Sequence, residues 1–300
     1  MRTILSSALA VLAVAVATSP LNSAAQQANN RERTLYVSAV DEQGEPVADL
    51  GPDAFIVQED GRRREVLRVS PATDPMDLAL FIDTSQAATD EITFFREALT
   101  KFVTALSGGE YRIALIGLAE RPTVLVQYTS DTAQVTTAAG RLFAMAGSGM
   151  TLLDALYETS RGLRRRDAPR ATFVPVVTDG VEFTNRYSKD IVRELRQSGA
   201  ALHAVMLGQF RYSDEHSLRE RIFLLDEGTK ATGGQRITLL APHGLAAAME
   251  RLARELSHQY KVVYGRPDSP FTGDVVEVSS ARPGITMRGI LARGQTGATK

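Results

Sequence analysis

An apolar run that ends on an acid is the strongest chemical signal in this 300-residue sequence. The run Leu78–Ile82 predicts a buried strand, and Asp83 and Ser85 follow it directly. In open α/β sheets ligands bind at the carboxyl ends of the strands, so both side chains are expected at such an edge. A carboxylate beside a hydroxyl supplies oxygen ligands of the kind that Mg²⁺, Mn²⁺ and Ca²⁺ prefer. The pair therefore indicates one part of a hard-cation site.

Two later segments carry residues that would complete such a site. Thr151 ends the glycine-rich segment Gly147–Thr151 and is placed to open the next helix, while Asp179 follows the apolar run Thr172–Thr178. Each of these residues could instead have an ordinary local role, because Asp, Ser and Thr are common at helix N-termini. The candidate metal ligands are Asp83, Ser85, Thr151 and Asp179.

The elements that must position these residues alternate between strand and helix from Met76 onward. This pattern predicts an α/β fold with a doubly wound, mostly parallel sheet of Rossmann-like type. Pro175 lies inside an expected central strand, where it removes one ladder hydrogen bond. The predicted strands are 78–82, 112–118, 123–127, 172–178, 201–207 and 235–238, and the predicted helices are 90–106, 132–145, 152–165, 189–197, 218–232 and 245–259.

Segments that alternate apolar and polar residues lie on both sides of this region. They predict strands at 34–40, 55–58, 65–69, 260–264, 274–278 and 285–291, with a hairpin turn at Glu59–Gly61. Neither group has enough strands for a core of its own, so we predict that they pair into one small β-sandwich with the α/β domain inserted into it. The expected organisation is a signal peptide at 1–25, a β segment at 34–70, the α/β domain at 76–259 and a second β segment at 260–293.

The first 25 residues have the pattern of a secretory signal peptide. Arg2 precedes the apolar stretch Ile4–Ala17, which is too short to span a bilayer comfortably, and Ser23–Ala25 offers small residues for cleavage. An uncleaved membrane anchor is the alternative interpretation. We expect an exported protein, either periplasmic or extracellular, with no membrane span in the mature chain.

Composition excludes several function classes. The chain has no Cys, which rules out disulfides, Cys nucleophiles and thiolate metal sites. Arg2 is one of the 34 basic residues, so the mature chain keeps 33 basic and 35 acidic residues and offers no electrostatic case for binding nucleic acid. The four His residues lack zinc-ligand spacing, and no Gly-x-Ser-x-Gly elbow is present. No catalytic residue is predicted.

The order and spacing of these motifs resemble those of the von Willebrand factor type A (VWA) domain. The resemblance rests on Asp83-x-Ser85-x-Ala87, on Thr151 before Leu-Leu-Asp-Ala-Leu, and on Thr178-Asp179-Gly180. Outside the site, residues 40–61 and 256–284 resemble the lead-in and the tail of exported bacterial VWFA-related proteins. The likeness thus covers about residues 34–293.

The family's metal-ion-dependent adhesion site takes Asp-x-Ser-x-Ser, a Thr and an Asp from three such loops. The resemblance implies that Ser85 and Thr151 bind the metal directly, and that Asp83 and Asp179 act partly through water. It also implies that the open coordination position captures a carboxylate from a partner protein. Ala87 departs from the pattern because it replaces a Ser ligand. Either water fills that position and Mg²⁺, Mn²⁺ or Ca²⁺ binds more weakly, or the site is degenerate and the fold binds its partner without metal.

The resemblance implies an exported, non-enzymatic, protein-binding domain of adhesion type. Two other functions stay open: a metal-independent scaffold or assembly protein of the cell envelope, and a hydrolase or other enzyme that uses the cation as a Lewis acid. Asp154 is expected in the first turn of its helix, where the helix dipole favours an acid. Glu182 and Asn185 are expected either in a solvated loop or at the rim of the site.

Overall fold

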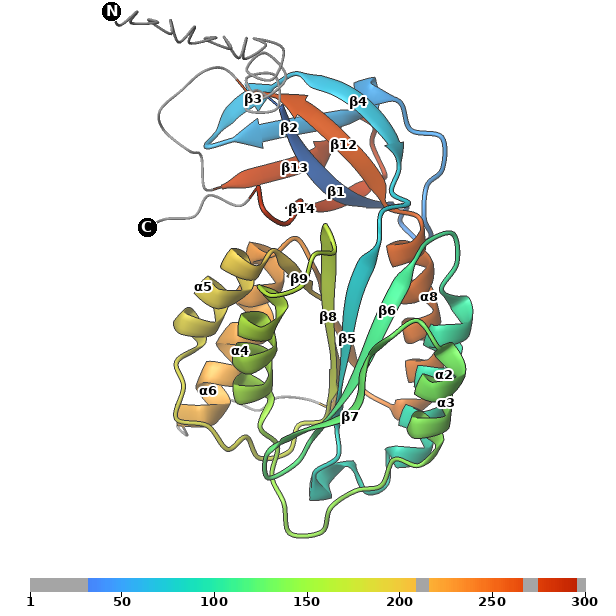
Figure 1. Cartoon of the computed structure of the whole chain (residues 1–300), viewed down its shortest axis with the longest axis vertical. Helices are drawn as coiled ribbons and strands as arrows, with labels where there is room; N and C mark the ends of the chain where they lie inside the picture. The colour runs from blue at the N-terminus through green and yellow to red at the C-terminus, as the bar shows by residue number, and fades with distance from the viewer. Residues whose placement is uncertain (1–31, 209–215, 267–274, 296–300) are drawn as a thin grey trace, which may run out of the picture.

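The computed structural model describes residues 32–208, 216–266 and 275–295. An α/β domain lies beside a smaller region built mainly of strands (Figure 1). The expected signal peptide, residues 1–25, lies outside the described residues. Within the three described ranges, no helix is both long enough and apolar enough to cross a membrane.

A seven-stranded sheet forms the centre of the α/β domain, in the order β11-β10-β8-β5-β6-β7, with β9 beside β8. All its strand pairs are parallel except that of β6 with the edge strand β7. The central strands β5 and β8 are buried along their whole length, as apolar runs covered on both faces should be. The strands are β5 (Met76–Asp83), β6 (Tyr111–Leu118), β7 (Pro122–Thr129), β8 (Arg170–Val177), β9 (Ala200–Leu202), β10 (Ala204–Leu207) and β11 (Arg236–Leu239).

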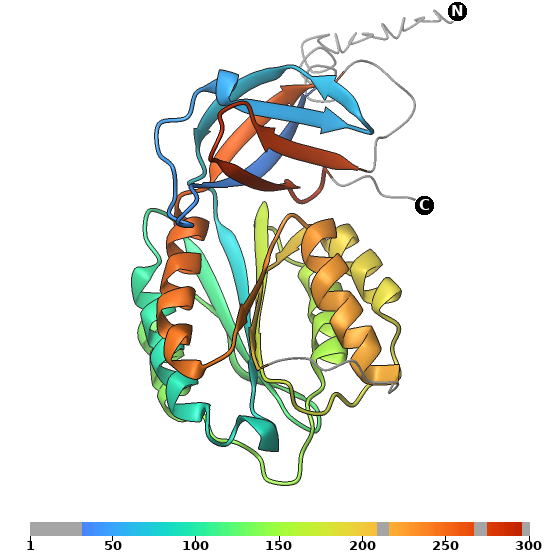
Figure 2. The same ribbon diagram turned by 180° about the vertical axis from the view of Figure 1, so that it is seen from behind.

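Helices cover both faces of this sheet (Figures 1 and 2). Helices α2, α3 and α8 share one apolar core with the sheet, and α4, α5 and η3 share the other. The predicted α/β class is confirmed. The helices are α2 (Ile92–Ala105), α3 (Thr132–Gly140), α4 (Leu152–Leu163), α5 (Ser188–Ser198), α6 (His216–Phe223), α7 (Thr229–Ala231) and α8 (Leu245–Ser257), with the π-helical turn η3 (Leu224–Gly228) and the short 3₁₀ turns η1 (Pro52–Ala54), η2 (Gln86–Ala88) and η4 (Pro242–Gly244).

Strands from both ends of the chain pair to form the smaller region. β1 (Glu32–Val40) lies between β12 (Tyr260–Gly265) and β14 (Thr286–Leu291), and β2 (Phe55–Glu59) pairs with β13 (Val276–Ser280). All these pairs are antiparallel. The two sheets, β14-β1-β12-β4 and β13-β2-β3, share one apolar core, so the predicted β-sandwich of flanking strands is present. The remaining strands are β3 (Arg62–Arg64) and β4 (Val66–Pro71).

The expected strand 201–207 is interrupted at His203, and Pro175 explains the interruption. The His203 N–H donates to the Phe173 carbonyl at 2.9 Å. In an unbroken parallel ladder the next bond would run from residue 175 back to the His203 carbonyl, but proline has no N–H. β9 therefore ends at Leu202 and β10 begins at Ala204.

Three other elements differ from the sequence prediction. The expected helix 132–145 ends at Gly140, because Leu142 turns into the core and its carbonyl accepts a hydrogen bond from the Arg96 side chain. The expected helix 218–232 is divided into α6, η3 and α7. The expected strand 65–69 corresponds to β4, which pairs with β12 in the other sheet, while the separate short strand β3 completes the hairpin with β2.

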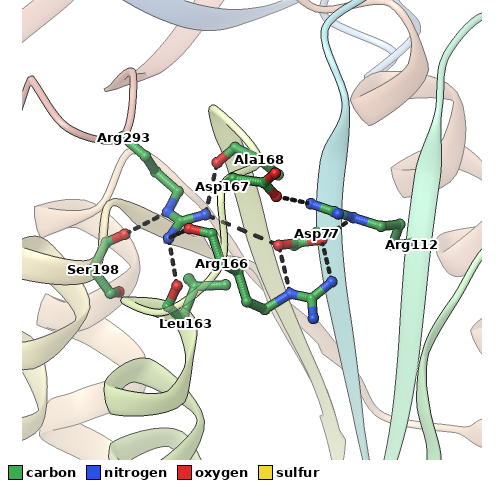
Figure 3. A network of polar contacts seen from close by, with 8 residues as sticks. All are labelled: Asp77, Arg112, Leu163, Arg166, Asp167, Ala168, Ser198 and Arg293. Carbon is green, nitrogen blue, oxygen red and sulfur yellow. Dashed lines mark hydrogen bonds and ion pairs between the residues drawn. The ribbon is translucent and has the colours of Figure 1, made fainter.

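A network of arginines joins the C-terminal segment to the α/β domain (Figure 3). Arg293, which follows β14, lies 4.0 Å from the buried Asp77 carboxylate near the start of β5. Asp77 also pairs with Arg112 and Arg166, each at 2.7 Å. This network lies at the opposite end of β5 from Asp83, so it secures the junction between the two regions. Arg293 also donates to four main-chain carbonyls, those of Leu163, Arg166, Ala168 and Ser198.

Candidate functional site

Asp83 ends β5 at the point where the connections of the sheet change direction. From β5 the chain continues through α2 to β6 on one side, whereas β8 pairs with β5 on the other side. Ligands of open α/β sheets bind at such a switch point. The buried Asp83 carboxylate accepts hydrogen bonds from the Thr178 N–H at 3.1 Å, from the Thr178 hydroxyl at 2.5 Å and from the Ser85 N–H at 2.9 Å. One carboxylate thus joins the loops after β5 and β8.

The loop before α4 is tied to both of these loops. The Gly147 N–H donates to the Gln86 side-chain oxygen at 2.8 Å, which fixes it to the loop after β5. The Met150 N–H donates to the Val181 carbonyl at 2.8 Å, which fixes it to the loop after β8. The three predicted loops therefore meet at one edge of the sheet and hold one another in place.

Ser85 is the residue whose environment points most directly to ligand binding. Its side chain is fully buried, and its Oγ atom has no hydrogen-bond partner within the described part of the chain. A buried hydroxyl left unsatisfied is costly, so such an atom calls for a partner. Gly180 packs close by: a Cβ placed on it would be 3.7 Å from Ser85 Oγ and 2.4 Å from the Ala87 Cβ. Glycine at position 180 is what lets the third loop close over Ser85.

Thr151 and Asp179 lie on the other two loops. The buried Thr151 hydroxyl donates its proton to the Ala119 carbonyl at 3.0 Å and makes no capping bond to α4. The lone pairs of the Thr151 oxygen therefore point away from the Ala119 carbonyl. Asp179 is exposed, and its carboxylate lies beside Gly208, where an added Cβ would be 2.8 Å from Asp179 Oδ2. The structure thus joins Asp83 to Ser85 directly, places Thr151 on a loop bonded to theirs, and leaves the Asp179 carboxylate in solvent.

No protein-family model matches the sequence, and no curated protein matches it significantly. Solved structures do match. Proximal thread matrix protein 1 from the mussel byssus is 14% identical with a TM-score of 0.50, over 66% of this chain and 51% of that one. A von Willebrand factor type A protein from Catenulispora acidiphila is 12% identical with a TM-score of 0.47, over 88% and 74%. The chain has the fold of a VWA domain. It spans about half the length of the mussel protein, one structure of which has a zinc-occupied MIDAS motif.

Glu91 adds a carboxylate to this edge of the α/β domain, and the sequence prediction missed it. Burial raises the pKa of Glu91, and the neighbouring carboxylates of Asp90, Asp179 and Asp83 raise it further. Its Oε2 atom is buried and has no hydrogen-bond partner in the described structure. Several negative groups therefore lie close together here, a distribution that favours a cation. The sequence signal that could have identified Glu91 is an acidic residue at the start of the helix that follows the Asp83 loop.

Glu182 is buried, which corrects the expectation of a solvated loop. Its Oε1 accepts the Leu153 N–H at 3.1 Å in the first turn of α4, and its Oε2 lies 3.8 Å from the buried Arg221 guanidinium of α6. Burial raises the pKa of the Glu182 carboxyl to about 8, and Arg221 opposes this shift. Glu182 thus fixes the helix that Thr151 opens. Sequence alone could not place it there, because its two partners come from other elements.

A polar groove of about 790 Å³ runs beside Thr151 in the α/β domain. Asp154 lies in the first turn of α4, as predicted, and pairs with Arg186 in this groove at 2.6 Å. The Arg186 guanidinium also lies over the Tyr157 ring at 4.0 Å. Among the described residues no group of three or more His, Cys, Asp or Glu side chains could hold a metal ion.

Proposed function

We propose that this VWA domain is an exported, non-enzymatic protein-binding domain that takes an acidic side chain of a partner protein at the carboxyl edge of its sheet. A divalent cation, Mg²⁺ or in its place Mn²⁺ or Ca²⁺, connects the two proteins. The observation that carries the proposal is the buried Ser85 hydroxyl next to Asp83 at the switch point of the sheet, which has no hydrogen-bond partner among the described residues.

The residues at this edge fit a hard cation. The Ser85 and Thr151 hydroxyl oxygens would hold it directly, with the Thr151 proton already donated to a carbonyl. Asp83 and Asp179 would hold it through water, since both oxygens of Asp83 already accept hydrogen bonds. When bound, the ion supplies the positive charge that attracts a partner's carboxylate, which the acidic groups of this edge would otherwise repel.

Ala87 favours a second candidate function, a scaffold or assembly role without metal. Its methyl group offers no ligand at the position where the VWA pattern has a hydroxyl. In this case the same edge binds its partner through main-chain and side-chain contacts alone. The two candidates differ in one measurable property, which is the dependence of partner binding on divalent cations.

Calorimetric titration with Mg²⁺, Mn²⁺ and Ca²⁺ tests the proposal on the purified protein. We expect binding in the millimolar range for the natural chain and its loss in Ser85→Ala. Ala87→Ser supplies the hydroxyl ligand of the VWA pattern and should tighten metal binding by roughly tenfold or more, since loss of even a residue that only supports the ligands typically costs that much in metal affinity. Ser148→Ala, on the neighbouring loop, is the matched control. Absence of heat in both the natural chain and Ala87→Ser would refute the metal and leave the scaffold function.

Export and partner binding are tested in the source cells. We expect N-terminal sequencing of the mature protein to begin after the small residues at Ser23–Ala25. A pull-down from the envelope fraction should recover a partner only without chelator. Recovery of the intact chain from the cytoplasm would contradict export, and partner capture that is unchanged by chelator would favour the scaffold.

A further inference from the structure

A second cavity, here called the β6–β7 pocket, lies between β6, β7 and α3. Its volume is about 680 Å³, and its lining is mostly apolar. Leu125, Phe143 and Met145 line it, and their side chains are 41%, 68% and 43% exposed. Large apolar side chains that gather in solvent around one cavity mark a binding surface.

The floor of the β6–β7 pocket lies at Gly117, a strand residue that has no side chain. Gly117 lies in β6, and a Cβ placed on it would be 3.2 Å from Thr84 Oγ1 and 3.5 Å from Leu125 Cδ1. A larger side chain at this position would fill the cavity. Glycine inside a strand weakens it, and it often marks a place where another molecule approaches the backbone.

The β6–β7 pocket shares its wall with the candidate cation site. Thr84 lines the pocket and stands between Asp83 and Ser85 in the chain. Ala119 also lines it, and its carbonyl accepts the Thr151 hydroxyl. Neighbouring residues of a chain are only about 3.8 Å apart. Because Thr84 is adjacent in the chain to both Asp83 and Ser85, the pocket lies beside the candidate cation site.

Charge at the rim agrees with an acidic segment. Arg141 lines the pocket and is exposed, and within the described residues it makes no ion pair. Its guanidinium thus offers a positive charge at the rim of the pocket. A partner segment that carries a carboxylate meets favourable charge along this path.

We infer that the β6–β7 pocket takes a large apolar side chain of the partner, adjacent in the partner's chain to the Asp or Glu that reaches the cation site. The inference rests on the proposed function. It specifies the partner's chemistry: a segment in which Leu, Ile, Met or Phe lies next to an acid. The apolar contact then contributes to the affinity, and the cation makes binding depend on a carboxylate in the partner.

Two probes test the inference. The first is the apolar aromatic anion 8-anilinonaphthalene-1-sulfonate, titrated in chelator and followed by fluorescence. We expect one site, lost in Gly117→Val and weakened in Phe143→Ser, but unchanged in Ser85→Ala and in Leu240→Ser, a control of similar exposure. Melting curves show whether Gly117→Val folds. If it does not, Phe143→Ser still tests the pocket. If both pocket variants bound the dye as tightly as the natural chain does, the inference would be overturned.

The second probe is a pair of peptides, Gly-Gly-Leu-Asp-Gly-Gly and the same peptide with Ser for Leu, which compete with the dye in Mg²⁺. We expect the Leu peptide to compete roughly tenfold better, the gain typical of burying one such side chain. Equal competition by the two peptides, or none, would overturn the inference. Preference for Leu that survives in chelator and in Ser85→Ala would instead refute the cation of the proposed function while the pocket stands.

Discussion

Replacing His203 by Gln should make the protein less sensitive to acid. The His203 side chain is 1% exposed, and neither ring nitrogen has a hydrogen-bond partner within the described residues. Burial lowers the pKa of His203 to about 4, while Glu255 of α8 raises it and Arg288 of β14 lowers it further. His203 is therefore neutral in the folded protein at neutral pH.

The sign and size of the effect follow from these values. In the unfolded chain the pKa is about 6.5, so between about pH 6.5 and pH 4 the unfolded state binds a proton that the folded state refuses. Stability therefore falls as the pH falls through this window. A folded pKa of about 4 predicts a loss of roughly 2.5 kcal/mol between about pH 7.5 and pH 4.5.

Urea unfolding at these two pH values measures the effect for the natural chain, for His203→Gln and for His258→Gln, whose ring is exposed. Other titrating groups contribute equally to all three proteins, so the difference in the change of unfolding free energy isolates His203. We expect His203→Gln to lose about 2.5 kcal/mol less than the natural chain on acidification, and His258→Gln to lose as much as the natural chain. The same loss in all three proteins would refute the reasoning.

Three further substitutions have defined outcomes. Arg293→Met should lower the free energy of unfolding by roughly 2–4 kcal/mol, because buried carbonyls lose their donor, whereas the exposed control Arg161→Met should change little; equal denaturation midpoints would contradict this. Asp131→Ala removes the side chain that caps α3 and should cost about 1 kcal/mol in the same assay. Gly180→Ala should destabilise the protein by roughly 1–3 kcal/mol, because its Cβ would lie 2.4 Å from that of Ala87. The double variant Gly180→Ala, Ala87→Gly should recover most of this loss, and failure to recover would place the strain elsewhere.

The fold was predictable because burial leaves a direct mark on sequence. Strands covered on both faces, such as β5, must be continuous apolar runs, and amphipathic helices between them require a parallel sheet. The pairing of the two β segments was also predictable, since neither could bury a core alone. Helix ends were less predictable: α3 stops at Gly140 because Leu142 and Arg96 draw the chain into a turn, a contact between distant residues.

Some residues of the candidate site could be predicted from the sequence, and others could not. Asp83 and Ser85 were found because they directly follow an apolar run, and position along a strand is local information. Glu91 and Glu182 were not found, because their roles come from burial and from partners on other elements. The β6–β7 pocket had no sequence signal beyond Gly117, since a cavity is a property of how strands and a helix pack.

The order of elements, the apolar strands and the loops where oxygen ligands could gather can all be read from the amino-acid sequence. These are consequences of hydrophobic periodicity, which acts along the chain. Three further features come from tertiary packing: within the described residues the buried Ser85 hydroxyl has no hydrogen-bond partner, the Thr151 hydroxyl donates to the Ala119 carbonyl, and an apolar pocket lies beside the loop that carries Asp83 and Ser85. Each of these depends on the distance between residues far apart in the chain, and folding alone sets that distance.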